Sequence, residues 1–327
     1  MRNSSRPARL GTMIAAAGLA LMLAVPAMAQ DTRSFTDDAG RTVEVPVAPK
    51  RIVTLHDSSL TVPLVELGII PVGSFGRAAA DGGFYMRGAA TLTGATFENS
   101  NIAYVGGTPA DIEAIAALEP DLIITSSFQA APVEQLEKIA PTVMVEDNVA
   151  GELSTFEDIA ELTGTQDRLV TLKARYEGQL NQIRALIEGK NITASIFLMQ
   201  DGQIAAWHTY GVLGKVLRDA GVGFPAIIDG IEGTDRQLFS GEELQAFDAD
   251  VIFVTYDLQR QEGPDVIMSQ IEAMTPGFCQ FLFACANDQL VMLPREDAVA
   301  RSYTALGLMT EAVLISLTAT PLKQIQN

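Results

Sequence analysis

Residues 165–188 read TQDRLVTLKARYEGQLNQIRALIE. The apolar side chains of this stretch recur at spacings of three and four residues, and no proline interrupts them. They are Leu169, Leu172, Tyr176, Leu180, Ile183 and Leu186. This periodicity predicts one long amphipathic helix. A helix of about 22 residues spans roughly 33 Å, about the diameter of a small domain. We therefore expect a rigid connection between two compact regions.

Short apolar strands alternate with helices on both sides of this stretch, after an opening pair of strands that flanks a turn at residues 38–40. Strands are predicted at residues 51–55, 69–73, 122–125, 142–145, 195–199 and 251–255. Helices are predicted at residues 58–67, 111–118, 133–139, 211–220 and 302–317, the first of them capped by Ser58 or Ser59. This alternation is typical of α/β structure with a largely parallel sheet. We predict two α/β lobes, residues 30–164 and 191–327, joined by a single long helix over residues 165–190.

An internal repeat supports two similarly built lobes. Residues 111–124 read DIEAIAALEPDLII, and residues 240–253 read SGEELQAFDADVIF. An alignment without gaps pairs Glu113 with Glu242 and Asp121 with Asp250. Each copy predicts a helix, a tight turn and a buried strand. The alternative is that any helix–turn–strand unit of an α/β protein looks like this. If the repeat is real, a cleft between the lobes is a favoured place for a small-molecule site.

The first 29 residues have the features of an export signal. Three arginines lie within the first nine residues, an apolar run covers residues 13–25, and small residues precede the expected cleavage after Ala29. The alternative is a membrane anchor, but no long apolar stretch follows. Because no cysteine stands at the cleavage site, we expect a periplasmic protein without a lipid anchor.

Charge and cysteine usage narrow the functional classes further. The net charge of −18 opposes binding to nucleic acid or to an anionic membrane, and it suits a carrier that docks on a basic partner. In an oxidising compartment the close pair Cys279 and Cys285 predicts a disulfide. The alternative, a zinc site, needs more ligands than the two histidines of the chain, His56 and His208, supply.

Two further segments resemble a known family. Residues 37–55 read DDAGRTVEVPVAPKRIVTL, and residues 64–77 read LVELGIIPVGSFGR. With the repeat and the long helix, they resemble class III periplasmic binding proteins of ABC importers over nearly the whole chain after residue 29, with the ferric-siderophore branch the most similar. The resemblance implies two lobes, a shallow cleft and a small closing motion. It also implies capture of a ferric siderophore for delivery to the inner-membrane permease, by a monomer without a cofactor.

Other functions remain as alternatives. A heme or cobalamin binding protein of the same fold is the nearest of these. An exported enzyme is more remote, since the sequence shows neither a nucleophile elbow nor a phosphate loop.

Arginine and aromatic side chains at strand-to-helix loops are the candidate ligand contacts. The chelator commonly satisfies the iron, so the protein must recognise the outer surface of the complex with charged donors and flat contact area. The candidates of the first lobe are His56, Arg77, Tyr85 and Arg87, and those of the second are Trp207, His208, Tyr210, Tyr256, Arg295, Arg301 and Tyr303. Each has a structural alternative as a surface charge, a packed ring or a local cap. We expect no side chain to bind iron directly, except that His208 with a tyrosine could complete the shell of an incomplete chelator.

Glu113 and Glu242 are candidates for a different contact. In the family that the chain resembles, one exposed glutamate on each lobe docks with arginines of the permease. The repeat places these two residues at equivalent positions, so the resemblance implies this role for them. The alternative is two solvated carboxylates on helix surfaces.

Overall fold

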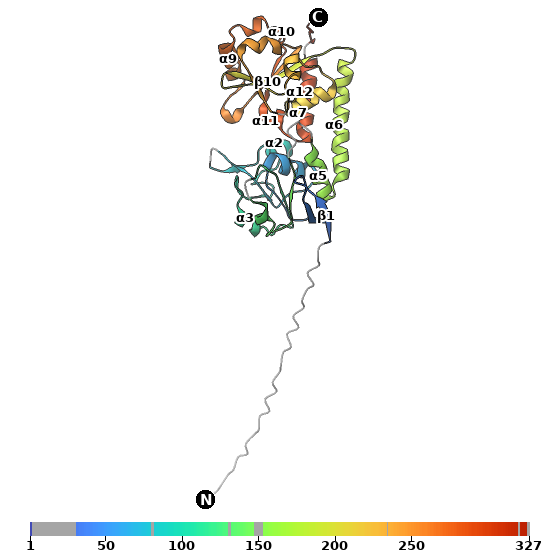
Figure 1. The fold of residues 1–327 in the computed structure, drawn as a ribbon, viewed down its shortest axis with the longest axis vertical. Helices are drawn as coiled ribbons and strands as arrows, with labels where there is room; N and C mark the ends of the chain where they lie inside the picture. Colours follow the sequence, from blue (N-terminus) through green and yellow to red (C-terminus); the bar gives the residue numbers. More distant parts are fainter. Residues whose placement is uncertain are drawn as a thin grey trace. The chain divides into compact units, whose positions relative to one another are not determined.

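The computed structural model of the chain describes Met1 and residues 31–79, 82–129, 132–146, 153–233, 235–319 and 321–325. The predicted export signal of residues 1–29 therefore lies outside the described part, apart from Met1. Residues 31–327 form one compact unit. Two five-stranded sheets, each with its own helices, make up the N-terminal and C-terminal lobes of this unit (Figure 1).

The N-terminal lobe is built on a fully parallel sheet in the order β7-β4-β3-β8-β9. Its strands are β3 (Ile52–Thr54), β4 (Gly73–Ser74), β7 (Ala103–Tyr104), β8 (Leu122–Thr125) and β9 (Thr142–Met144). A hairpin of β1 (Thr32–Thr36) and β2 (Thr42–Pro46) precedes the sheet, and a short ribbon pairs β5 (Arg77–Ala78) with β6 (Phe84–Tyr85). The helices are α1 (Val62–Glu66), α2 (Ala89–Thr93), α3 (Ile112–Ala117), α4 (Val133–Leu136) and α5 (Ser154–Thr163). Every residue of β3 and β8 is buried, as expected of central parallel strands covered on both faces.

The C-terminal lobe has a mixed sheet in the order β12-β11-β10-β13-β14. The strands β10 (Ala194–Gln200), β13 (Val251–Tyr256) and β14 (Leu290–Pro294) are parallel, whereas β11 (Gln203–Ala206) and β12 (Gln237–Phe239) run antiparallel to their neighbours. The helices are α7 (Gly211–Ala220), α8 (Ala226–Asp229), α9 (Pro264–Met274), α10 (Phe283–Ala286), α11 (Arg295–Val299) and α12 (Tyr303–Thr318). Three 3₁₀ segments complete it: η2 (Gly241–Phe247), η3 (Leu258–Arg260) and η4 (Phe278–Gln280).

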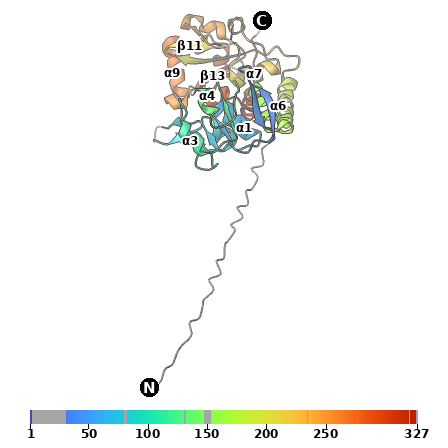
Figure 2. The same ribbon diagram turned by 60° about the horizontal axis from the view of Figure 1, so that its bottom comes forward.

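The long helix is α6 (Gln166–Ile187), which confirms the prediction made for this stretch. Figures 1 and 2 show it alongside both lobes. Toward the C-terminal lobe, the Tyr176 hydroxyl donates to Asp219 Oδ2 at 2.9 Å, and Arg184 Nη2 donates to the Asp219 carbonyl at 2.9 Å. Toward the N-terminal lobe, Arg168 Nε donates to the Glu66 carbonyl at 3.1 Å. Helix α6 is thus hydrogen-bonded to both lobes.

The internal repeat has a structural basis in two hydrogen-bonding aspartates, the half-buried Asp121 and the buried Asp250. The Asp121 carboxylate accepts the N–H groups of Lys50 and Arg51 just before β3, at 2.7 and 2.8 Å. Asp250 Oδ2 accepts the N–H of Thr193 just before β10, at 2.8 Å. Each aspartate therefore satisfies the backbone at the start of the neighbouring strand in its own lobe. The copies differ in their helix, because α3 is an α-helix and η2 is a 3₁₀ helix.

Three local predictions need correction. The first helix is capped by His56, whose Nδ1 accepts the N–H of Ser59 at 3.1 Å, and not by Ser58 or Ser59. The reason is that the chain enters a π-helical turn η1 (Asp57–Thr61) one residue earlier than expected, directly from the extended His56. The strand predicted at residues 69–73 starts only at Gly73, after Pro71, which has no N–H for the ladder. On α6, Ile187 is buried in place of the predicted Leu186.

The predicted disulfide between Cys279 and Cys285 is present, with a Cα–Cα distance of 4.8 Å. It joins η4 to α10 beside the apolar core of the C-terminal lobe. Among the described residues, no helix combines the length and apolarity that crossing a membrane requires.

Candidate functional site

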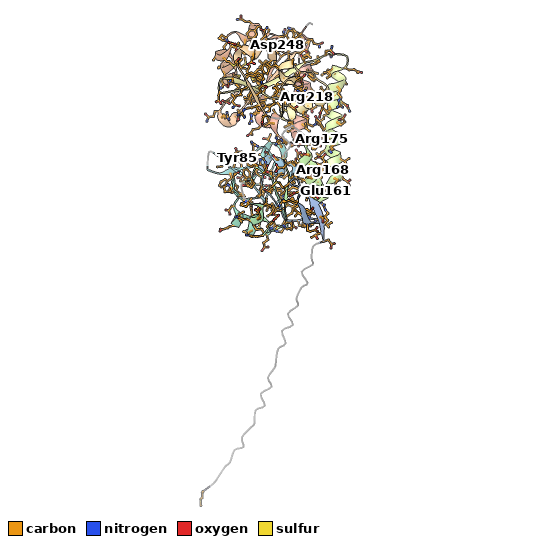
Figure 3. The ribbon with its side chains drawn as sticks, in the orientation of Figure 1. Tyr85, Glu161, Arg168, Arg175, Arg218 and Asp248 are labelled. Atoms are coloured by element: carbon orange, nitrogen blue, oxygen red, sulfur yellow. A yellow bond between two sulfur atoms is a disulfide. The ribbon has the colours of Figure 1, made fainter. Side chains whose placement is uncertain are left out.

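A cavity of about 400 Å³ is lined by residues of both lobes. The N-terminal lobe contributes Ser58, Ser59, Arg77, Tyr85, Arg87 and Gly88. The C-terminal lobe contributes Trp207, Thr209, Tyr210, Gly211, Asp257, Arg295, Glu296, Val299, Ala300 and Arg301. Tyr85 lies on the edge of the N-terminal lobe nearest the C-terminal lobe (Figure 3). The cavity thus brings together most of the predicted ligand contacts, namely Arg77, Tyr85, Arg87, Trp207, Tyr210, Arg295 and Arg301.

Asp57 positions the arginines of the N-terminal wall, by which we mean the residues of the N-terminal lobe that line the cavity. Its side chain is completely buried and receives Arg77 through two bonds, Nε–Oδ2 at 2.7 Å and Nη2–Oδ1 at 3.2 Å. The backbone N–H of Arg87 adds a third bond to Oδ2 at 2.9 Å. Burial alone would raise the pKa of Asp57, but the hydrogen bonds and charge of Arg77 outweigh it and hold the pKa below its ordinary value. Asp57 therefore stays charged and fixes the position of both arginines.

Two further guanidinium groups, those of Arg87 and Arg301, line the cavity from opposite lobes. Arg87 follows β6, and its Nη2 donates to the Ser58 hydroxyl at 3.0 Å. Burial lowers the pKa of Arg87, and the charge of Arg77 lowers it further. Burial also lowers the pKa of Arg301 to about 10, with Arg87 as the next contributor. Positive charges from both lobes thus act on one another within the cavity, and an anion there would relieve the repulsion.

The C-terminal wall combines aromatic rings with a loose ion pair. The Trp207 and Tyr210 rings meet edge to face with centroids 5.0 Å apart, and the Tyr210 hydroxyl is 2.7 Å from Thr255 Oγ1. Burial raises the pKa of Tyr210, so its hydroxyl stays protonated. Arg295 Nη1 is 3.9 Å from Asp257 Oδ2, at the limit of an ion pair. This wall offers flat contact area with charged groups at its edge.

The two predicted histidines lie elsewhere. His56 is buried below the N-terminal wall, where it caps η1 and its ring centroid lies 4.7 Å from that of Phe128. Burial lowers the pKa of His56 to about 4, so its ring is neutral at ordinary pH. His208 pairs its Nδ1 with Thr209 Oγ1 at 3.1 Å, and its carbonyl accepts a bond from Arg218. His56 thus has the local capping role that was weighed against ligand binding, and His208 is not among the residues that line the cavity.

The remaining two predicted contacts are also packed away from the cavity. Tyr256 ends β13 and packs against the apolar core of the C-terminal lobe. Tyr303 is buried, and its ring meets Phe156 edge to face with centroids 4.9 Å apart. We therefore leave the two histidines and these two tyrosines out of the candidate site.

The sequence prediction missed the acidic and hydroxyl members of the site. Asp57, Ser58 and Ser59 begin three positions after the end of β3, where the carboxyl end of a parallel strand meets the cleft, and this position was an available signal. Asp257 follows β13 in the same way. Glu296 could not be found from the pattern, because α11 is too short to show a periodicity.

No three His, Cys, Asp or Glu side chains of the described residues come together as metal ligands would. The site is a polar, arginine-rich and aromatic cavity between two α/β lobes that one long helix connects. This arrangement defines the class III fold of periplasmic binding proteins. The model of the periplasmic binding protein family matches residues 101–276, more than half of the chain, and the chain belongs to this family.

The individual relatives are distant in sequence, but each match covers about two thirds of this chain or more. The chain is 27% identical over 231 residues to the probable siderophore-binding lipoprotein YfiY of Bacillus subtilis, a match covering 68% of each protein. It is 27% identical to the achromobactin-binding periplasmic protein of Dickeya dadantii, over 67% of this chain and 70% of that one. The structure of Staphylococcus aureus SirA complexed with staphyloferrin B is similar with a TM-score of 0.69 at 23% identity, over 88% of this chain and 98% of that chain.

Proposed function

We propose that this protein is the periplasmic solute-binding component of an ABC importer, and that it captures a ferric siderophore and delivers it to the inner-membrane permease. The observation that carries the proposal is one cavity lined by arginines from both lobes beside the Trp207–Tyr210 pair. The relatives named above, a probable siderophore-binding lipoprotein and an achromobactin-binding periplasmic protein by their names, support the same function.

The cavity has the chemistry that an iron complex requires of its carrier. The chelator surrounds the metal, so the protein meets polar oxygens and flat ligand surfaces. Asp57 holds the Arg77 side chain and the Arg87 backbone in place before the ligand arrives. Little side-chain entropy is therefore lost when Arg77 binds the ligand. Trp207 and Tyr210 supply rigid contact area. In this proposal the iron needs no protein ligand, and the protein needs no cofactor.

Trp207 provides a direct test, because it is the only tryptophan of the chain. We expect ferric siderophores to quench its fluorescence saturably, and the iron-free chelators to quench it far less. Heme and cobalamin serve as competitors. Saturable binding of heme with a shifted Soret band, and no response to any ferric chelate, would contradict the proposal and favour a heme carrier.

The permease contact is proposed for Glu113 and Glu242. Both side chains are exposed and lie in the first turns of α3 and η2, the two equivalent segments of the repeat. Exposed acids on both lobes would pair with basic residues of a permease that touches both lobes at once. Such pairs would speed docking at low ionic strength.

The double variant Glu113→Ala with Glu242→Ala tests this role. We expect it to abolish uptake of ferric siderophore by cells, with ligand affinity and thermal stability unchanged in the purified protein. A matched control replaces two other exposed glutamates, Glu134 on α4 and Glu311 on α12, and should transport normally. Uptake at the wild-type rate by the first variant would show that the two glutamates are ordinary surface residues.

A further inference from the structure

The four arginines of the cavity differ in how their charges are matched. Arg77 is neutralised by the buried Asp57 at 2.7 Å, and Arg295 lies near Asp257 at 3.9 Å. The side chain of Arg87 instead donates to a neutral partner, the Ser58 hydroxyl. Among the acids, the charge of Asp57 acts most strongly on Arg87 and that of Glu296 comes next, but Asp57 is already paired with Arg77. Four arginines line the cavity against two acids, Asp257 and Glu296. The cavity therefore keeps a positive centre in a protein whose net charge is −18.

Arg301 completes this positive centre from the C-terminal lobe. It lines the same cavity as Arg87 and lies close enough for their charges to repel each other. An anionic group between the two guanidinium groups would accept charged hydrogen bonds from both lobes at once. A neutral or cationic ligand would leave the repulsion in place.

The position of Arg301 depends on a carboxylate of the other lobe. Glu66 ends α1 and is buried, and its two oxygens accept the N–H groups of Tyr303 and Thr304 at 2.9 and 3.0 Å. These N–H groups belong to the first turn of α12, which starts two residues after Arg301. The Ser302 hydroxyl accepts the next N–H group, that of Ala305, at 2.9 Å. The first amides of α12 are thus satisfied, two of them by a residue of the N-terminal lobe.

This contact is suited to fix the start of α12, in the C-terminal lobe, relative to the N-terminal lobe. A carboxylate at the start of a sixteen-residue helix interacts favourably with the N–H groups that have no partner within the helix, and with the helix dipole. Buried as it is, the same carboxylate would be costly without these partners. Arg168 of α6 donates to the Glu66 carbonyl, so α1, α6 and α12 meet at this residue; Figure 3 shows Arg168 on α6. The backbone next to Arg301 is therefore fixed relative to the wall that carries Arg87.

We propose that the site selects anionic ferric chelates by bridging Arg87 and Arg301, and that Glu66 is the positioning residue that sets this bridge. The proposal rests on the proposed function and adds to it the charge class of the ligand. It also assigns a role in binding to a residue outside the cavity. Neither the ligand class nor the role of Glu66 follows from capture of a ferric siderophore as such.

The ligand class is tested with three probes of different charge. Ferric citrate is anionic, ferrichrome is neutral and ferrioxamine B is cationic. We expect the wild-type protein to bind ferric citrate at least tenfold more tightly than either of the others, as measured by Trp207 quenching. Arg301→Gln should lower the preference for ferric citrate over ferrichrome about tenfold. Equal affinities for the three probes would overturn the selection of anions while leaving siderophore capture intact.

The role of Glu66 is tested by a double-mutant cycle with Arg301. Glu66→Gln keeps the size of the side chain and removes its charge. In the wild-type background we expect it to weaken ferric citrate binding about tenfold. In the Arg301→Gln background we expect less than a twofold effect, although Glu66→Gln lowers thermal stability equally in both backgrounds. A merely structural role would give the same loss of affinity in both backgrounds, and that result would overturn the assignment.

Ser302→Ala is the matched control, because it removes the cap that belongs to α12 itself and leaves the contact across the lobes. It should lower stability without changing the preference for ferric citrate. A change of preference as large as that of Glu66→Gln would show that capping α12, and not the contact with Glu66, positions Arg301. If the wild-type protein binds none of the three probes or any other ferric chelate, the proposed function itself fails.

Discussion

The two walls of the cavity carry similar ion pairs with different surroundings. In the N-terminal wall, Asp57 is completely buried and lies 2.7 Å from Arg77. In the C-terminal wall, Asp257 lies 3.9 Å from Arg295, and the two side chains are 18% and 37% exposed. The first pair is a fixed part of the fold, whereas water and neighbouring charges screen the second. The difference teaches that the N-terminal lobe presents its arginines in a set geometry and that the C-terminal lobe can adjust to the ligand.

The largest effect should come from removing the charge of the buried aspartate. Asp57→Asn leaves Arg77 without its counter-ion, and we expect a loss of about 3–5 kcal/mol in the free energy of unfolding. The matched variant Asp257→Asn should lose less than about 1 kcal/mol. Urea unfolding at pH 7 measures both. Equal losses would remove the distinction between a fixed and an adjustable wall.

A smaller effect should appear in the pH dependence of the N-terminal wall. The pKa of His56 is lowered from 6.5 to about 4. Between these two pH values the His56 ring is therefore protonated in the unfolded chain and neutral in the folded protein. The contribution of His56 to stability is therefore complete above pH 6.5 and is lost as the pH falls through this range, by about 2–3 kcal/mol.

The control for this prediction is His56→Asn, which keeps a side chain suited to cap η1 and removes the titration. The difference in unfolding free energy between wild type and variant should shift against the wild type between pH 6.5 and pH 4. A difference that stays constant with pH would show that His56 is not held neutral by the wall.

The smallest of the three effects should belong to the C-terminal lobe. Reducing the disulfide between Cys279 and Cys285, six positions apart, should lower the free energy of unfolding by about 2 kcal/mol. Ligand affinity should not change, because the disulfide lies beside the core of the lobe and away from the cavity. Alkylation of the native protein should label neither cysteine before reduction. Labelling of both without a reductant would contradict the disulfide.

The periodic parts of the chain were predictable, and the parts set by long-range contacts were not. The apolar spacing of α6 and the alternation around it were sufficient to predict two lobes and a connecting helix. The arginines and aromatics expected at loops gave seven of the sixteen residues that line the cavity. Glu66 and Tyr303 lie far apart in sequence, so no local pattern shows that one caps the helix of the other. The position of Asp57 after β3 was visible in the sequence, but its pairing with Arg77 was not, because only the fold brings the two side chains together.

The meeting of α12 with Glu66 also has a mechanical consequence. The lobes are joined through α6, and again where the start of α12 rests on the N-terminal lobe. With these two connections in place, the easiest motion of one lobe relative to the other is a rotation about the line that joins them. Loading and release would then be opposite senses of a single small turn. A permease that bound Glu113 and Glu242, one on each lobe, would contact both of the parts that rotate. Its binding could therefore drive the rotation that releases the ligand.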